Sequence, residues 1–160
     1  GVGAQKDLAS EGMKLAADHG EVLTIKSDNL DTDGKILNRV KWMLPIADKT
    51  FKLGATYEWG IIESVPSEKG KQDLLETITP ILSDEISNGI KVLKHESGLR
   101  PASHDRRPYA GPLKDNPGVF VLNGLGTRGV LVGPAVAIQL AKHIYEMVAL
   151  QKEIKCNRSL

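Results

Sequence analysis

A glycine-rich turn near the end of this 160-residue chain constrains its fold more than any other feature. Residues 124–129 read Gly-Leu-Gly-Thr-Arg-Gly, one residue after the short apolar run 119–122 and before a stretch with helical spacing at 130–149. A turn of this kind lets the backbone approach a ligand and presents unpaired N–H groups at a helix start. We predict a strand, a turn and a helix here. The turn either faces a ligand or has its glycines for tight packing alone.

The spacing G-x-G-x-x-G also matches the fingerprint of dinucleotide-binding folds. That fold needs a second parallel strand, with an acidic residue about 20 positions further on to hold the ribose. Here only residues 151–160 follow the helix, and they are mostly polar. A complete dinucleotide-binding unit is therefore disfavoured, and we predict a polar tail. The residues that keep helical spacing in this stretch are Leu131, Ala135, Ile138, Ala141 and Met147.

The first hundred residues have the pattern of an antiparallel sheet with helices on one face. Ser67 is a candidate N-cap for a helix at 68–78, and Pro80 separates it from a second short helix at 81–86. Asp33-Gly34 is a strong hairpin signal between the first two strands. The predicted strands cover 20–26, 36–44, 50–56 and 90–95. The fold class expected from this pattern is α+β.

Residues 98–118 differ in character from the rest. They hold four of the eight prolines, together with Arg100, His104 and Asp105, which is typical of a loop. We predict an irregular connection here.

Composition and charge exclude several classes of function. Twenty-one basic and twenty acidic residues give a net charge of +1, which is unlike a nucleic-acid binder. The longest apolar run is too short and too interrupted to span a membrane. A single cysteine, Cys156, excludes an internal disulfide and suggests a cytoplasmic setting. The histidines show no metal-ligand spacing, no Ser/His/Asp set is evident, and we assign no catalytic residue.

Several short motifs occur in an order that resembles a known family. Gly-Leu-Arg-Pro at 98–101 is followed by Asp-x-x-Pro-x-x-Gly at 105–111, a short strand, Gly-x-x-x-x-Gly at 124–129 and a closing helix. This order resembles the C-terminal signature of the D-amino-acid oxidase and glycine oxidase family of FAD-dependent flavoproteins. Upstream, Gly-Glu-Val-Leu at 20–23 and Leu-Gly-Ala-Thr at 53–56 resemble two strands of that family. The resemblance covers about residues 1–150.

The resemblance implies an oxidoreductase that transfers a hydride from an amine or amino-acid-like substrate to FAD. It divides the chain into the end of an FAD-domain segment (1–18), a substrate-binding sheet domain (19–96), a return of the FAD domain (97–150) and the tail (151–160). The family's N-terminal FAD-binding segment has no counterpart in these residues. We therefore expect a fragment that is inactive alone, does not retain FAD and needs the missing FAD-binding domain as its partner. The alternative is a cofactor-free binding or interaction domain that keeps the fold.

The resemblance also implies roles for particular residues. Arg100 would bind a substrate carboxylate, Arg128 would make a second polar contact, and Tyr57 would reach the substrate with its hydroxyl. The flavin ring would meet the backbone of the turn and helix start, formed by Gly124, Leu125, Gly126, Thr127, Arg128, Gly129 and Val130.

Overall fold

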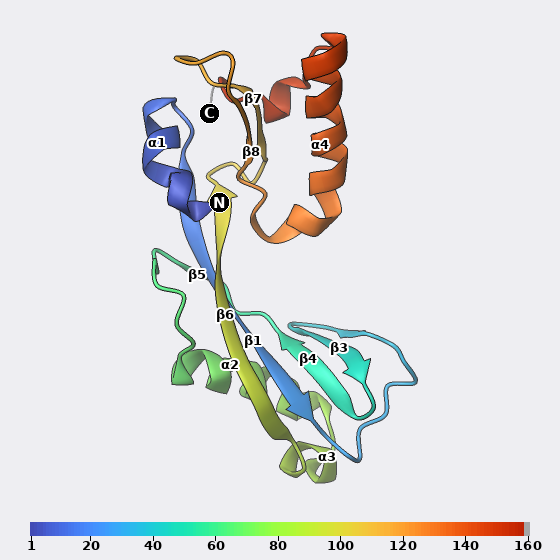
Figure 1. The fold of residues 1–160 in the computed structure, drawn as a ribbon. Coiled ribbons are helices and arrows are strands. Elements are labelled where there is room, and N and C mark those ends of the chain that lie inside the picture. The colour runs from blue at the N-terminus through green and yellow to red at the C-terminus, as the bar shows by residue number, and fades with distance from the viewer. Residues whose placement is uncertain (159–160) are drawn as a thin grey trace. The chain divides into compact units, whose positions relative to one another are not determined.

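The computed structural model describes residues 1–158, which form two compact units (Figure 1). The first unit combines residues 1–18 with the chain from 99 onward, and the second unit comprises residues 19–98. The division expected from the family resemblance has its boundaries at residues 18 and 96. The assignment of the units to a flavin domain and a substrate domain stays a prediction.

A mostly antiparallel sheet forms the framework of the second unit. Its strand order is β2-β3-β4-β1-β5, and β6 also pairs with β1. The strands are β1 (Leu15–Lys26), β2 (Leu37–Asn38), β3 (Trp42–Ala47), β4 (Thr50–Gly54), β5 (Glu58–Trp59) and β6 (Lys91–Ser103). The predicted α+β class with an antiparallel sheet is confirmed.

Two helices cover one face of this sheet (Figure 1). The helix α2 (Glu68–Ile78) has the predicted bounds, and the Ser67 side chain accepts a hydrogen bond from the Gly70 N–H at its start. After a short 3-10 turn, η2 (Thr79–Ile81), the helix α3 (Asp84–Asn88) begins at Asp84, with Ser83 as its N-cap, rather than at residue 81. The predicted second helix was therefore placed too early, because Ser83 is the residue that caps it.

The core of the second unit lies between the sheet and α2. Leu74 and Ile78 are buried against strand residues at alternate positions. The strand contribution comes from Leu23, Ile25, Met43, Phe51 and Leu53. Because side chains of a strand alternate between faces, this spacing gives the sheet one apolar face for α2 to cover.

The hairpin predicted around Asp33-Gly34 is wrong. Strand β1 pairs with β4, with Leu23 opposite Leu53, whereas β2 pairs with β3. Asp33 and Gly34 have positive φ values of 52° and 71°, so they do form a turn, but it lies inside a longer connection. The predicted strand at 36–44 is also divided into β2 and β3. The burial of apolar side chains decided which strands pair, and the local turn did not.

The first unit combines a short hairpin with the last helix. Residues of β7 (Tyr109–Pro112) pair antiparallel with β8 (Phe120–Asn123), which leads through η3 (Gly126–Arg128) into α4 (Gly129–Glu146). The remaining short helices are η1 (Val2–Ala4), α1 (Gln5–Ser10) and η4 (Lys152–Ile154). The predicted helix at 130–149 ends earlier, at Glu146, and the next residue, Met147, has a left-handed φ of 57°.

The prediction of an irregular connection at 98–118 is wrong in part. Strand β6 continues to Ser103, and β7 occupies 109–112. Pro101 lies near the end of β6 and Pro112 at the end of β7. A missing N–H is tolerated better at the margins of a sheet than in its middle, so prolines did not exclude strands here.

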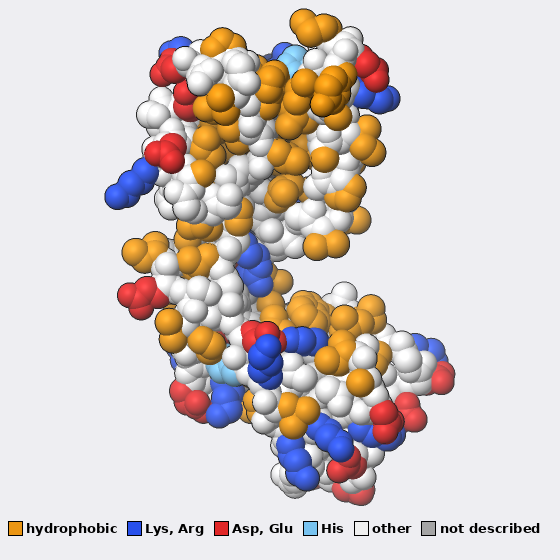
Figure 2. All heavy atoms as spheres, viewed as in Figure 1, with side chains coloured by type: hydrophobic (Ala, Val, Ile, Leu, Met, Phe, Trp, Pro, Cys, Tyr) orange, Lys and Arg blue, Asp and Glu red, His pale blue; other side chains and the backbone are white. Residues whose placement is uncertain are grey.

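The apolar residues with helical spacing in and just after α4 are exposed. Val136 is buried, whereas Ile138 is 60% exposed. Figure 2 shows apolar side chains gathered over the surface where α4 lies. The large exposed residues of this segment are Val130, Leu131, Ile138, Ile144, Tyr145, Met147 and Val148, which we call the exposed face of α4. No helix in residues 1–158 is long and apolar enough to cross a membrane.

The segment predicted as a polar tail packs against the first unit through residue 158. Leu150, Ile154 and Cys156 are buried, and Lys155 forms a parallel bridge with Ala110 of β7. These three residues belong to the apolar core of the first unit, so the segment is not free in solvent.

Candidate functional site

Arg100 lies on β6 and is held by a buried acid on the neighbouring strand. Its Nη1 donates a hydrogen bond of 3.3 Å to Oδ2 of Asp18, which is on β1. Asp18 is only 2% exposed, whereas the Arg100 side chain remains 24% exposed. A buried carboxylate is stable only when it is paired, and Arg100 provides this partner. Sequence reasoning missed Asp18, because nothing local connects residues 82 positions apart.

The glycine turn lies directly beside the end of the strand that carries Arg100. Leu125, within the turn, forms an antiparallel bridge with Ala102, two residues after Arg100. A Cβ built on Gly126 would lie 3.6 Å from the Cβ of Ala102. The structure thus brings together two motifs that are about 25 residues apart in the sequence.

The glycines of the turn are needed for two different reasons. Gly124 and Gly126 have positive φ values of 71° and 55°, which favour glycine. A Cβ on Gly124 would also lie 3.1 Å from Tyr109 and 3.2 Å from Leu15, inside the core. Gly124 is therefore required for packing, as the packing alternative predicts. Around Gly126 the nearest atoms belong to Ala102 and are at ordinary contact distance, so this part of the turn is more open.

The start of α4 is suited to an electron-rich group. No side chain caps it, and Val130 in its first turn is 97% exposed. The first N–H groups of a helix have no partner inside the helix and carry a partial positive charge. An 18-residue helix with such a start can stabilise negative charge placed next to it. The residues present thus fit contact with a flavin ring, which gains negative charge on reduction.

Arg128 holds a loop in the structure. Its Nη2 donates a hydrogen bond of 3.0 Å to the backbone oxygen of Arg106, in the loop between β6 and β7. Arg158 holds the same loop through two hydrogen bonds of 2.8 Å to the carboxylate of Asp105. These hydrogen bonds lower the pKa of Asp105 to about 2. The role of Arg128 as a substrate contact stays a prediction.

Tyr57 lies in the second unit, between β4 and β5, and is 53% exposed. Its exposure leaves the ring open to solvent, and its role in a substrate site stays a prediction.

A buried polar cluster in the second unit was not anticipated. The Glu21 carboxylate accepts hydrogen bonds from the Ser67 hydroxyl (2.7 Å) and backbone N–H (3.0 Å), and His95 Nε2 lies 2.5 Å away. Burial acts to raise the pKa of Glu21, but the contacts with Ser67 and His95 outweigh it and lower that pKa. A Cβ on Gly70 would lie 2.4 Å from the carboxylate. The cluster anchors the start of α2 to β1, which is a structural role.

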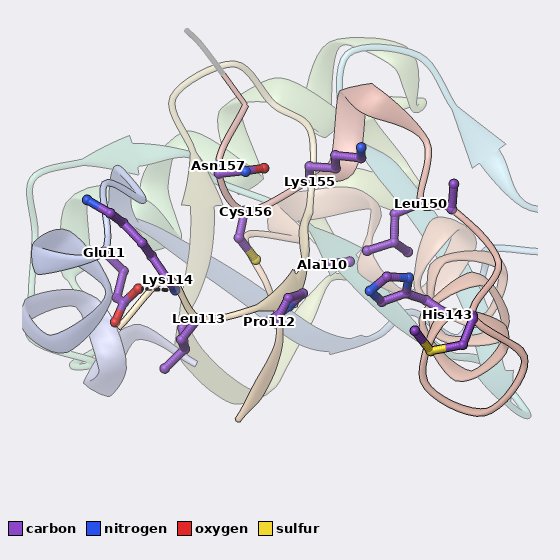
Figure 3. Close-up of a pocket in the computed structure, with 12 residues that line it drawn as sticks. Glu11, Ala110, Pro112, Leu113, Lys114, His143, Leu150, Lys155, Cys156 and Asn157 are labelled. Atoms are coloured by element: carbon purple, nitrogen blue, oxygen red, sulfur yellow. Dashed lines mark hydrogen bonds between the residues drawn. The ribbon is translucent and has the colours of Figure 1, made fainter. Parts of the chain in front are cut away.

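A cavity of about 640 Å³ lies elsewhere in the first unit, between β7, the end of α4 and the tail (Figure 3). In the close-up the Cys156 thiol points toward its centre, with Lys114 and Glu11 on one side and His143 on the other. Burial raises the pKa of Cys156 to about 11, so its thiol is protonated at neutral pH and is a poor nucleophile. Neither Arg100, Arg128 nor Tyr57 lines this cavity.

Comparison with known proteins gives one family and several relatives. A family model described as "FAD dependent oxidoreductase" (DAO) matches residues 1–143. The tRNA 5-methylaminomethyl-2-thiouridine biosynthesis bifunctional protein MnmC of Marinobacter nauticus is 29% identical over 147 residues, covering 87% of this chain and 23% of the relative. The glycine oxidase of Pseudomonas putida is 24% identical over 130 residues, which cover 80% of this chain and 35% of the relative.

Solved structures show the same fold. Iminodiacetate oxidase from Chelativorans sp. superposes with a TM-score of 0.76 at 24% identity, covering 94% of this chain and 43% of that one. Glycine oxidase from Geobacillus kaustophilus gives a TM-score of 0.77 at 22% identity, and the match covers 95% of this chain and 42% of that one. The chain therefore spans less than half the length of each of these proteins.

Proposed function

Since this chain belongs to the DAO family of FAD-dependent oxidoreductases, we propose that it is the C-terminal, substrate-facing part of a longer flavoprotein that oxidises an amine or amino-acid-like substrate. The substrate would carry an amine and a carboxylate. Several of the relatives are named as oxidases of such molecules, among them glycine oxidase and iminodiacetate oxidase.

The bridge between Ala102 and Leu125 is the observation that carries this proposal. It keeps the end of β6, with Arg100, beside the turn that opens α4. A guanidinium that binds the carboxylate of a small substrate would then hold the rest of that substrate near the helix start. A bidentate pair also fixes the orientation of the substrate, which is the main contribution a protein makes to a reaction whose chemistry the cofactor supplies.

In this proposal the backbone of residues 124–130 holds the pyrimidine edge of the flavin. Bound FAD would supply the acceptor for a hydride from the carbon that bears the amine. The uncapped start of α4 would stabilise the negative charge that develops on that side. Arg128 and Tyr57 would add polar contacts to the substrate.

The exposed face of α4 supports the presence of a further part of the protein. It places several large apolar side chains in solvent, among them Val130, Leu131 and Tyr145. Large exposed apolar patches are typical of surfaces that another domain covers. We propose that the FAD-binding domain covers this face. A cytoplasmic setting belongs to the same proposal, supported by the single, unpaired Cys156.

Substitution of Arg100 in the full-length flavoprotein tests the proposed function. We expect Arg100→Ala to raise KM for a carboxylate-bearing amine by about 30-fold or more, because losing a buried charge-assisted pair costs about 2 to 5 kcal/mol. Arg100→Lys should recover only part of this loss, since an ammonium cannot form the bidentate pair. Steady-state kinetics on a panel of amines with and without a carboxylate would measure both effects.

Arg107→Ala is the matched control, because Arg107 is an exposed arginine in the loop that follows β6. It should leave KM within about twofold of the unmodified enzyme, as surface substitutions do. Unchanged KM values for every carboxylate substrate in Arg100→Ala would refute the role of Arg100. A full-length protein that binds no flavin would instead support a cofactor-free binding domain.

A further inference from the structure

We propose that Asp18 is a positioning residue that orients Arg100 toward the substrate carboxylate. This inference rests on the proposed function, because it gives Asp18 a part in the same substrate site.

The first step of the argument is the location of the pair. Asp18 and Arg100 lie on β1 and β6, two strands that pair with each other, and both belong to the first unit. The hydrogen bond from Nη1 to Oδ2 is 3.3 Å long. Because both residues lie within regular strands, their backbones are fixed and the pair has one defined geometry.

The second step is the difference in burial between the two side chains. The Asp18 side chain is 3% exposed, whereas that of Arg100 is 24% exposed. The acid is therefore inaccessible to a substrate, and the guanidinium reaches solvent. A guanidinium carries five N–H donors in a planar fork, so a hydrogen bond from Nη1 to Asp18 is compatible with a second carboxylate at another edge.

The third step concerns Oδ1 of Asp18, which is buried and has no hydrogen-bond partner among residues 1–158. A buried carboxylate oxygen without a partner is costly, so a purely structural site would favour an apolar or fully paired side chain here. Positioning the guanidinium is a function that would offset this cost. Asp18 partly neutralises the charge of Arg100, and it also fixes the orientation of the Arg100 guanidinium plane.

The test is a double-mutant cycle in the full-length flavoprotein with a carboxylate-bearing amine as the probe. We expect Asp18→Ala to raise KM about tenfold and to change kcat by less than about threefold, because carboxylate binding is lost in the ground and transition states alike. Asp18→Asn keeps an oxygen acceptor of the same shape, so its KM should stay within about threefold of the unmodified enzyme. In the Arg100→Ala background, Asp18→Ala should raise KM no further.

Two controls separate this inference from a loss of stability and from failure of the proposed function. Asp73→Ala removes a different ion pair, the 2.9 Å contact with Lys41, and should leave KM unchanged. If Arg100→Ala itself leaves KM unchanged, the proposed function fails. If Arg100→Ala raises KM but Asp18→Ala does not, only the role of Asp18 fails. The same holds if Asp18→Ala raises KM by the same factor in the Arg100→Ala background as in the unmodified enzyme.

Asp18→Asn keeps the proposal testable should the alanine variant not fold. A KM below that of the unmodified enzyme in Asp18→Asn would show that Asp18 mainly weakens the charge of Arg100, and it would overturn the positioning role. A KM close to the unmodified value would support it.

Discussion

At the scale of single residues, the glycines of the turn differ in their surroundings, since one is packed in the core and another lies beside open space. Gly124 is enclosed by Tyr109, Leu15 and Ser103, so its lack of a side chain serves the core. Gly126 has a positive φ but only Ala102 near it, next to the uncapped start of α4. In the proposed function, Gly126 is therefore the glycine of the motif that lies next to the flavin.

Replacement of Gly126 by valine in the full-length flavoprotein should disturb the flavin ring. A branched side chain is strained at a φ of 55° and would enter the space next to the helix start. We expect altered flavin absorption and reduction potential together with weaker retention of FAD, recorded in one titration. Gly118→Val is the control, because Gly118 lies in the β7–β8 connection with only Asn116 nearby. Weaker FAD binding with an unchanged spectrum and potential of the bound form would favour a pyrophosphate at this turn instead.

At the scale of elements, α2 is fixed to the sheet by more than its apolar face. Ser67 accepts a hydrogen bond from Gly70 at the helix start and donates two to the buried Glu21 carboxylate of β1. Ser83 caps α3 with a longer hydrogen bond of 3.5 Å to the Ile86 N–H, in an exposed position. Both serines are N-caps of their helices, but only Ser67 also donates hydrogen bonds to a buried carboxylate.

This difference predicts unequal costs for two matched substitutions. Ser67→Ala should lower the free energy of unfolding by about 1 to 3 kcal/mol, because it removes a cap and a hydroxyl donor to a buried carboxylate. Ser83→Ala should cost less than about 1 kcal/mol. Urea unfolding of both variants, followed by circular dichroism, would measure the difference. Equal costs would show that the bond to Glu21 contributes no stability.

At the scale of the whole molecule, the chain covers less than half of its relatives and leaves the exposed face of α4 uncovered. In the proposed function, the helix start at residues 129–130 contacts only one edge of the flavin ring. Tight binding of FAD also requires groups that hold the pyrophosphate and the adenosine ribose, and the family's N-terminal segment is expected to supply them.

We therefore expect residues 1–160, purified on their own, to be colourless. The full-length flavoprotein, prepared in the same way, should be yellow and carry about one FAD per chain, as family membership implies. An absorption spectrum of both samples across the flavin bands checks this expectation. Stoichiometric flavin in the shorter sample would contradict it, and binding of NAD there would restore the dinucleotide interpretation of the turn.

The sequence by itself determined the features that depend on neighbouring residues. Ser67 and the apolar spacing after it defined α2, and the strand predicted at 50–56 corresponds to β4. The order of short motifs indicated the family. These signals are local, because caps, turns and backbone preferences act over a few residues.

Only the tertiary structure decided which distant segments meet. The pairing of β1 with β4, the burial of the tail and the pair of Asp18 with Arg100 all join residues far apart in the chain. The exposure of the apolar side chains of α4 was also decided by the tertiary structure, since helical spacing identifies apolar residues without saying what they contact. Such contacts depend on the total apolar area buried and on charges paired across strands, and no short window of sequence contains both partners.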